Sequence, residues 1–389
     1  MEQFTIADRL RVSRSLQRGK ARATLRRLSS PVSRMERRES EMKHTVFLTI
    51  FTILLLMIIS CENNSPLTLD EMNFPQQLTS SGHDLESYWS PNMEYIAFLT
   101  LRNTYDPTVA AVRFELWIMN YDGSDQRPLI LINDLYEGSI TVRSISWSKD
   151  SQDMLVRIQT PRGGSEVWRI SVDGSKARLS STDDWTGQPK HSPDGFKIAY
   201  SVQGPQLPNG SPFYSLFVSN PDFSEPVLID TGLISDFAWK NNSNVLIYGL
   251  YDWANVNFDF WTSSITGNEK AQFTNTPVSE EAPCCSPDGK YIAYSVRDSL
   301  YITPSDNFLI NKVFDNGRMP KWVPNSNILL ITSEQTFDNE SFWTESWVID
   351  LEGNVIKKIV EGKTSSVSYS TNGEYFVYSL DGNLWIDKF

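Results

Sequence analysis

Two stretches of the chain are near copies of one another: KHSPDGFKIAYS (190–201) and CCSPDGKYIAYS (284–295). Each places Ser-Pro-Asp-Gly before a short apolar segment. Because Asp-Gly tolerates the positive φ of a tight hairpin turn, each copy predicts a strand, a turn and a second strand. A supersecondary unit that recurs at this distance is typical of a repeat architecture.

Five further segments share this pattern. The intervals between successive motifs are 58, 44, 48, 46, 37 and 47 residues. After each motif comes a third strand, such as FELWIMN (114–120), and in most units a turn and a fourth strand, such as RPLILI (127–132). Short, evenly spaced strands of this kind indicate an all-β repeat array. The seven motifs begin at Trp89, Trp147, His191, Trp239, Cys285, Trp322 and Tyr369.

A four-stranded unit of this size cannot bury both of its faces, but a ring of such blades can. The seventh unit ends after its third strand, at Phe389, and FPQQLTS (74–80) has the character of a missing fourth strand. We therefore expect an all-β fold over residues 74–389: a seven-bladed β-propeller of four-stranded antiparallel blades. The N- and C-terminal strands are expected to share one blade and close the ring.

The motif Trp-Ser-Pro-Asp-Gly-x-x-Ile-Ala-Tyr/Phe, followed by a Trp-containing strand and x-Asp-Gly, resembles the TolB-type (WD-like) propeller repeat. That repeat occurs in periplasmic proteins and in the propeller domains of some peptidases. The resemblance covers about residues 74–389 and implies a fold rather than a function. TolB itself has six blades and an additional N-terminal α/β domain, for which the segment between Cys61 and the first blade is too short. Its Tol partners are therefore not carried over.

Residues 42–61 read MKHTVFLTIFTILLLMIISC. The apolar run 46–59 fits a signal-peptide core and is short for a membrane-spanning helix, which needs roughly 20 residues. Its ending, Ile-Ile-Ser-Cys, resembles the lipobox of bacterial lipoproteins, and this implies that Cys61 is acylated and becomes the mature N-terminus. We expect a lipoprotein signal peptide over 42–60 and a flexible tether over 61–73. The alternative is an ordinary signal or anchor helix in which Cys61 is incidental.

Charge divides the chain unevenly. Residues 1–43 carry 12 basic and 5 acidic residues, whereas the part from Cys61 onward carries 23 basic and 42 acidic residues. So acidic a body does not suit nucleic acid or an anionic membrane surface. We interpret 1–41 as a basic extension that is untranslated, with a start at Met42, or disordered. A long signal n-region and a nucleic-acid arm are the alternatives.

Few residues suit catalysis or a cofactor. There is no Gly-x-Ser-x-Gly elbow of an α/β-hydrolase, and only His83 and His191 follow the signal segment. This number is too small for a metal site built from several histidines. We expect no metal, no cofactor and no catalytic residue. His191 stands where other blades have Trp and is interpreted as a packed blade residue.

Three further groups are interpreted as structural. Cys284 and Cys285 lack zinc-site spacing and are expected to be buried at a strand end, with an adjacent disulfide as the alternative. The acid pairs 183–184 and 280–281 are read as solvated loops. The Asp residues of the turn motifs, such as Asp194 and Asp288, are expected to support the turns.

The connections between second and third strands are long and differ from one another, at 100–113, 202–213, 249–258 and 333–343. Variation confined to one face of a rigid scaffold is typical of a binding surface. Their aromatic residues suit stacking on sugars or gripping a peptide, although packing within the loops is the alternative. The candidate ligand-binding residues are Tyr105, Phe213, Tyr214, Tyr251, Trp253, Phe258, Phe337 and Phe342.

These features together predict a lipid-anchored protein of the bacterial cell envelope, periplasmic or surface-exposed. The residue after the acylated Cys is Glu62 and not Asp. By resemblance to lipoprotein sorting in some bacteria, the absence of Asp at this position implies the outer membrane. The propeller is expected to bind a protein, peptide or glycan without catalysis. A glycan hydrolase or lyase that uses loop carboxylates, and a structural part of an envelope assembly, are the alternatives.

Overall fold

The computed structural model describes residues 68–104, 113–136, 140–161, 163–180, 185–206, 210, 213–337 and 341–389. The chain divides into two compact units, Met1–Leu67 and Thr68–Phe389, and the description concerns the second. The predicted extension, the signal peptide and Cys61 lie outside the described residues. Apart from a single 3-10 turn, η1 (Leu69–Glu71), the described regular structure is β-strand.

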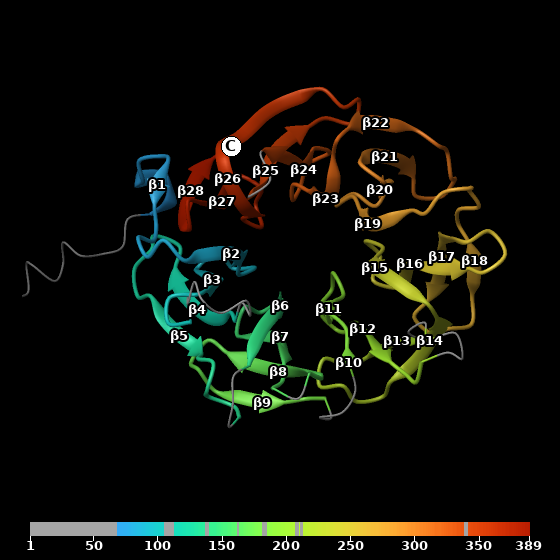
Figure 1. The fold of residues 1–389 in the computed structure, drawn as a ribbon, viewed down its shortest axis with the longest axis horizontal. Helices are drawn as coiled ribbons and strands as arrows, with labels where there is room; N and C mark the ends of the chain where they lie inside the picture. The colour runs from blue at the N-terminus through green and yellow to red at the C-terminus, as the bar shows by residue number, and fades with distance from the viewer. Residues whose placement is uncertain are drawn as a thin grey trace, which may run out of the picture. The chain divides into compact units, whose positions relative to one another are not determined.

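The strands form seven four-stranded antiparallel blades arranged as a propeller, with the first strand of each blade innermost (Figure 1). Four blades are separate sheets in which strand order follows the chain. Blade 1 contains β2 (Asp84–Trp89), β3 (Tyr95–Thr100), β4 (Glu115–Asn120) and β5 (Arg127–Ile130). Blade 2 contains β6 (Thr141–Trp147), β7 (Asp153–Gln159), β8 (Ser165–Ser171) and β9 (Lys176–Arg178). Blade 4 contains β15 (Ile234–Trp239), β16 (Val245–Asp252), β17 (Asn257–Ser264) and β18 (Lys270–Gln272), and blade 5 contains β19 (Glu281–Cys285), β20 (Tyr291–Val296), β21 (Ser299–Pro304) and β22 (Lys312–Asp315).

Blade 3 has a divided first strand. Two short segments pair with different parts of the same second strand, and Gly187 between them donates its N–H to the Ser201 carbonyl at 2.6 Å. The sequence motif that begins at His191 predicted only the second of these two segments. The strands of this blade are β10 (Trp185–Thr186), β11 (Lys190–His191), β12 (Ile198–Gln203), β13 (Tyr214–Ser219) and β14 (Val227–Gly232).

Blades 6 and 7 are joined by one long strand, β26 (Val355–Tyr369). Its first part pairs with β25 as the outer strand of blade 6, and its last part pairs with β27 as the inner strand of blade 7. The other strands are β23 (Arg318–Trp322), β24 (Leu329–Phe337) and β25 (Ser341–Ile349) in blade 6, and β27 (Tyr375–Leu380), β28 (Asn383–Lys388) and β1 (Gln76–Gln77) in blade 7.

The predicted closure of the ring by the two terminal strands is confirmed. Gln76 and Gln77 of β1 lie opposite Ile386 and Trp385 of β28. The Leu78 N–H donates to the Leu384 carbonyl at 2.8 Å. Closing the ring in this way removes the free outer edge that blade 7 would otherwise expose.

The Ser-Pro-Asp-Gly motif builds the first turns of blades 3 and 5 through side-chain hydrogen bonds. In blade 3, the Ser192 hydroxyl donates to Asp194 Oδ1 at 2.6 Å and accepts the Lys197 N–H at 3.0 Å, and Asp194 Oδ1 also accepts the Phe196 N–H. Because Ser192 donates to its ionised form, the pKa of Asp194 is lowered. Ser286 and Asp288 repeat the arrangement in blade 5, so the structural role predicted for this Asp is confirmed.

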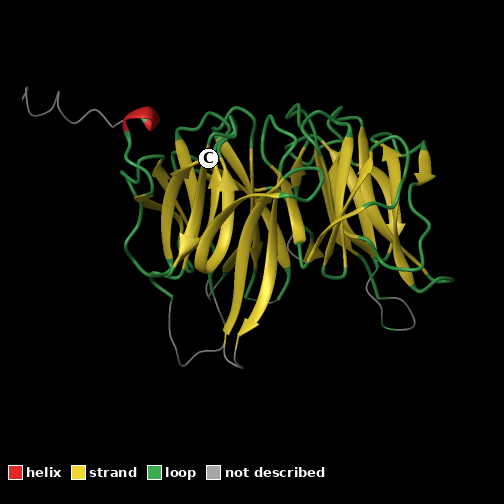
Figure 2. Cartoon of the chain, turned by 90° about the horizontal axis from the view of Figure 1, so that it is seen from above, coloured by secondary structure: helices red, strands yellow, loops and turns green. Residues whose placement is uncertain are grey.

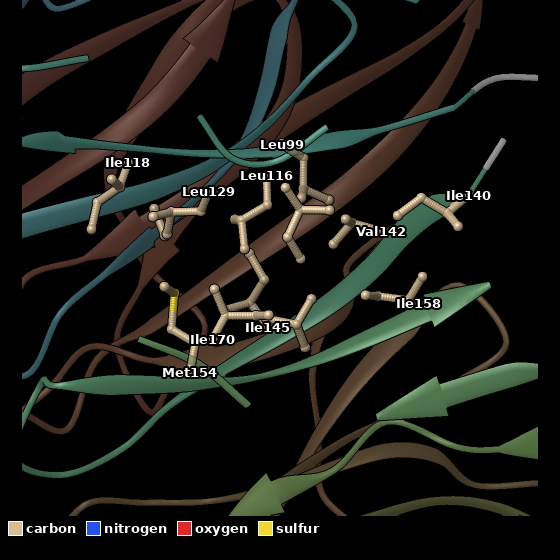
Figure 3. Close-up of a cluster of buried hydrophobic side chains, with 13 residues drawn as sticks. Leu99, Leu116, Ile118, Leu129, Ile140, Val142, Ile145, Met154, Ile158 and Ile170 are labelled. Atoms are coloured by element: carbon tan, nitrogen blue, oxygen red, sulfur yellow. The ribbon is translucent and has the colours of Figure 1, made fainter. Parts of the chain in front are cut away.

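The hydrophobic core lies between neighbouring blades, where seven clusters of buried side chains occupy the seven blade interfaces. Figure 3 shows one of them, in which Leu99 and Leu116 of blade 1 pack against Ile145, Met154 and Ile170 of blade 2. Burying each such side chain contributes roughly 1.5–3 kcal/mol. No blade could bury these faces alone, which is the physical reason for the ring.

The motif Trp ties adjacent blades together by a hydrogen bond. Trp239 Nε1–H donates to the Lys190 carbonyl of the preceding blade's first strand at 2.9 Å, and Trp322 Nε1–H donates to the Cys284 carbonyl at 3.0 Å. Trp147 bonds the Tyr88 carbonyl in the same way. The aromatic residue thus fills the interface and satisfies a backbone acceptor.

Candidate functional site

We call the end of the blades that carries the connections between second and third strands the long-loop face, and the opposite end the short-turn face. Figure 2 shows the blades edge-on, with a two-stranded hairpin reaching beyond the others at one end. The longest such pair is β24 with β25, nine residues each. Phe337 and Phe342 belong to this pair and face Ser341 and Thr336 in the backbone register. Their side chains, and all of Tyr105, lie outside the description.

Three of the predicted aromatic residues gather on the hairpin of β16 and β17. The Tyr251 ring meets Trp253 edge-on at 4.8 Å between centroids and Phe258 at 5.1 Å. Tyr251 and Phe258 are cross-strand partners, so most of the predicted loop 249–258 is paired strand instead. The strands extend into the predicted loop because an aromatic cross-strand pair favours continued strand pairing.

The tip of this hairpin exposes apolar side chains. Trp253 is 51% exposed and Val256 is 72% exposed. Asp252 fixes the tip, since its carboxylate accepts the Ala254 N–H at 2.8 Å and the Asn255 side-chain amide at 2.7 Å. A tip that is held in place while displaying apolar surface is suited to contact with a partner.

Phe213 and Tyr214, the other two described candidates, are half-buried at the start of β13. Phe213 accepts the Gly204 N–H through its carbonyl at 2.7 Å, and its ring lies against Gly204. Tyr214 packs with Leu250 against the core between blades 3 and 4. Phe213 and Tyr214 therefore pack inward, as the alternative interpretation of the loop aromatics predicted. Of the five candidate aromatic residues that the structure describes, Trp253 is the exposed one.

Two arginines that the sequence analysis did not single out lie at the long-loop ends of β6 and β7. Arg143 is exposed and donates through Nε and Nη2 to Gln159 Oε1, at 3.0 and 2.7 Å. Arg157 is half-buried and donates through Nε to the Ser165 hydroxyl at 3.3 Å. Burial lowers the pKa of the Arg157 guanidinium, and the like charge of Arg143 lowers it further, while Tyr214 raises it.

Two carboxylates beneath the aromatic hairpin are buried rather than solvated. Asp259 is 0% and Glu280 is 1% exposed. Glu280 contacts the hydroxyls of Thr274 and Thr276 at 2.9 and 2.5 Å. Burial raises its pKa to about 7, and the Asp259 charge adds to the increase. The prediction of a solvated loop was therefore wrong for Glu280; Glu281 is exposed, and Asp183 and Asp184 lie outside the description.

Asp259 belongs to a recurring position that the sequence reading also missed. Glu115 and Glu166 are likewise buried at the start of third strands, two residues before the Trp of that strand. The Trp168 Nε1–H donates to Glu166 Oε2 at 3.0 Å, and the Trp117 indole reaches Glu115 at 3.2 Å. The acid-x-Trp spacing was visible in the sequence and indicates a structural acid.

His191 is a packed residue, as predicted. Its Nδ1 lies 2.9 Å from the Ser146 hydroxyl of the neighbouring blade. Burial lowers the pKa of its imidazole to about 4, so the ring is neutral at physiological pH.

Cys284 and Cys285 both have free thiols, so the alternative of an adjacent disulfide does not hold in this structure. Both residues are half-buried. Burial raises the pKa of the Cys285 thiol to about 12 and also raises that of Cys284. These thiols are therefore not activated as nucleophiles.

The described residues contain no group of three or more His, Cys, Asp or Glu side chains placed to hold a metal ion. None of the helical structure in the same part of the chain is long and apolar enough to cross a membrane.

Two acids on the inner strands, Asp236 and Glu86, are engaged by local partners. Lys190 Nζ lies 2.8 Å from Asp236 Oδ1 and 2.7 Å from the Phe237 carbonyl. The Tyr88 hydroxyl donates to Glu86 at 2.5 Å. These acids are thus engaged by neighbours and are not gathered into a cluster beside the aromatic hairpin.

Comparison with known proteins yields likeness of fold only. No family model and no curated protein matches the chain. Among solved structures, TolB from Acinetobacter baumannii is 15% identical with a TM-score of 0.48, covering 67% of this chain and 62% of its own. The fold of this chain is a seven-bladed β-propeller. A putative TolB from Agrobacterium tumefaciens is 16% identical with a TM-score of 0.48, covering 68% of this chain and 94% of its own. This chain spans about three fifths of the length of the Acinetobacter protein.

Proposed function

We propose that this chain is a lipid-anchored envelope protein whose propeller binds a protein, peptide or glycan partner through the long-loop face, without catalysis. The observation that carries the proposal is the β16–β17 hairpin tip, where Trp253 and Val256 remain exposed although neighbouring residues fix the backbone. Large exposed aromatic residues on a rigid support are the usual anchors of binding surfaces.

The membrane anchor in this proposal rests on the sequence of residues 42–61, whose apolar run ends directly at Cys61. Acylation at Cys61 would leave a short tether before the first blade strand. A tethered propeller could meet partners in the envelope without a spanning helix of its own. Placement in the outer membrane is part of the same proposal.

The absence of catalysis is supported by the burial of the acids beside the hairpin. Asp259 and Glu280 would be the natural pair for a glycan hydrolase, which needs two carboxylates facing its substrate. Both are almost fully buried, and Glu280 is held by two threonine hydroxyls. A substrate on the surface could not reach either one, so the binding function is favoured over the hydrolase or lyase.

Co-purification from native membranes tests the proposed function. The full-length protein is compared with a Trp253→Ser/Val256→Ser variant, and partners are quantified by mass spectrometry. Phe196→Ser is the matched control, because Phe196 is 74% exposed on the short-turn face. We expect the hairpin variant to lose a partner that the control retains. Equal recovery by all three proteins would overturn the assignment of this face.

A further inference from the structure

Arg143 and Arg157 lie on neighbouring strands of blade 2, and no described carboxylate forms an ion pair with either of them. Arg143 and Arg157 are held in place by Gln159 and Ser165, which are neutral acceptors. Arg157 lies two residues before Gln159 on β7, and the charge of the neighbouring Arg143 lowers the pKa of Arg157. A pair of like charges held together without a counterion stores unfavourable electrostatic energy that an anion would relieve.

Most other arginines in the described propeller have acidic partners. Arg102 pairs with Asp84 at 2.7 Å, Arg127 with Asp125 at 3.3 Å and Arg178 with Glu166 at 3.8 Å. The part of the chain from Cys61 onward has 42 acidic and 23 basic residues, so acids are plentiful. Arg169 and Arg297 also lack a described acidic partner, but Arg143 and Arg157 are the two whose side chains lie beside one another, so a single acid from a partner could pair with both.

The arginine pair lies beside the proposed binding surface. Tyr214 of blade 3 is close enough to Arg157 to affect its pKa. The same tyrosine packs with Leu250, next to the aromatic residues of the β16–β17 hairpin. Arg143, Arg157, Tyr214 and the hairpin thus form an arc across blades 2, 3 and 4 on the long-loop face.

We propose that the partner is an acidic peptide segment, whose Asp or Glu carboxylate sits on Arg143 and Arg157 while a nearby apolar side chain packs on Trp253 and Val256. This inference rests on the proposed function of the long-loop face. Guanidinium groups bind carboxylates through paired, charge-assisted hydrogen bonds. A peptide suits the surface better than a glycan does, because Val256 is aliphatic and 72% exposed, whereas sugars stack on aromatic rings.

Selection from a random peptide library on the detergent-solubilised full-length protein tests the proposal. We expect enriched peptides to carry Asp or Glu close to an aromatic or aliphatic residue. Binding of a selected peptide should weaken at least about tenfold in an Arg143→Gln/Arg157→Gln variant, since a hydrogen bond to a charged group is worth about 1.5–3 kcal/mol. It should weaken similarly when the peptide's acids become amides, and it should fall as salt is added.

Two controls keep the result specific. Arg169→Gln removes the same charge from an exposed position on β8 of the same blade and should leave affinity unchanged. Arg157→Lys keeps the charge but not the planar donors, so its affinity should lie between those of the wild type and the double variant.

Four outcomes would overturn the inference. They are enriched peptides without acids, full affinity in the double variant, no enrichment at all, and tighter binding of a galacturonate oligosaccharide than of any peptide. Non-acidic peptides whose binding still requires Trp253 would overturn the acid preference alone and leave the proposed function standing. Failure of the proposed function itself would appear as partner recovery, in the co-purification, that is unaffected by the hairpin variant.

Discussion

The Arg102 guanidinium holds the Asp84 carboxylate through two parallel hydrogen bonds, Nε to Oδ1 at 2.8 Å and Nη2 to Oδ2 at 2.7 Å. Asp84 begins the inner strand of blade 1 and is fully buried. The Ser379 hydroxyl of blade 7 donates to the Asp84 carbonyl at 3.0 Å. The ion pair therefore lies beside the junction where the two ends of the chain close the ring.

Arg102→Ala should destabilise the propeller strongly. The variant leaves a buried carboxylate without its partner, which typically costs about 3–5 kcal/mol of unfolding free energy. Chemical denaturation measures the difference. Arg127→Ala is the control, because its partner Asp125 is exposed and such pairs contribute about 1 kcal/mol or less. Equal losses in the two variants would contradict the role given to the buried pair.

The Asp84–Arg102 pair should also make the stability of the fold depend on pH. Burial acts to raise the pKa of Asp84, but the hydrogen bonds from Arg102 and Ser81 outweigh it and the pKa is lowered. The pair therefore stabilises the fold above the pKa that Asp84 has when unfolded, and this contribution is lost as pH falls towards the folded pKa. The stability gap between wild type and Arg102→Ala should shrink on acidification.

Gly382→Ala should weaken ring closure more than an ordinary glycine replacement in a turn. At φ +72°, a Cβ at this position would lie 2.0 Å from the Gly82 carbonyl oxygen, which belongs to the other end of the chain. Gly174 also has positive φ, but open space surrounds it. Gly174→Ala should cost roughly 1–2 kcal/mol of stability for the backbone strain alone, and Gly382→Ala roughly 1–3 kcal/mol more for the clash. Thermal unfolding compares them, and equal shifts would count against a tight seam here.

Glu280 should make stability decline as pH rises from about 4.5 to about 7. Its folded pKa is raised to about 7, so in this window the folded state binds more protons than the unfolded state, and folding weakens with increasing pH. Glu280→Gln removes this effect and should be more stable than wild type at pH 8, by on the order of 1–3 kcal/mol. Denaturation at pH 5 and pH 8 measures the change. Parallel pH profiles of the two proteins would show that Glu280 does not titrate as described.

The proposed anchor predicts the mass of the mature protein. Intact mass of membrane-extracted protein should match a chain that begins at acylated Cys61. A Cys61→Ala variant should lack the acyl addition and appear in the soluble fraction. A wild-type mass that corresponds to a chain with residues before Cys61 and no acyl groups would contradict the proposed lipid anchor.

Periodic features of the sequence were sufficient to predict the propeller. The recurring strand-turn-strand pattern marked the inner hairpins, and the Ser-Pro-Asp-Gly turns of blades 3 and 5 form as expected. The pairing of β1 with β28 was predictable because the seventh unit lacked one strand. These features are local or repeated, so each copy reinforces the assignment of the others.

Non-local features could not be predicted in the same way. β26 serves two blades without interruption, although the sequence suggested two separate strands. The burial of Glu280 depends on a connection folding back against β17, and the proximity of Arg143 and Arg157 depends on a bulge in β6. Such contacts depend on the register and on neighbouring strands, which composition and turn signals do not specify.

Photo-crosslinking in intact cells tests the central claim most directly. A photoreactive amino acid is placed at Trp253 on the long-loop face or, in a matched protein, at Phe196 on the short-turn face, both exposed positions. We expect irradiation to join one defined partner to the protein labelled at position 253 and not to the one labelled at position 196. Crosslinks from position 196 alone, or the same products from both positions, would contradict binding through the long-loop face.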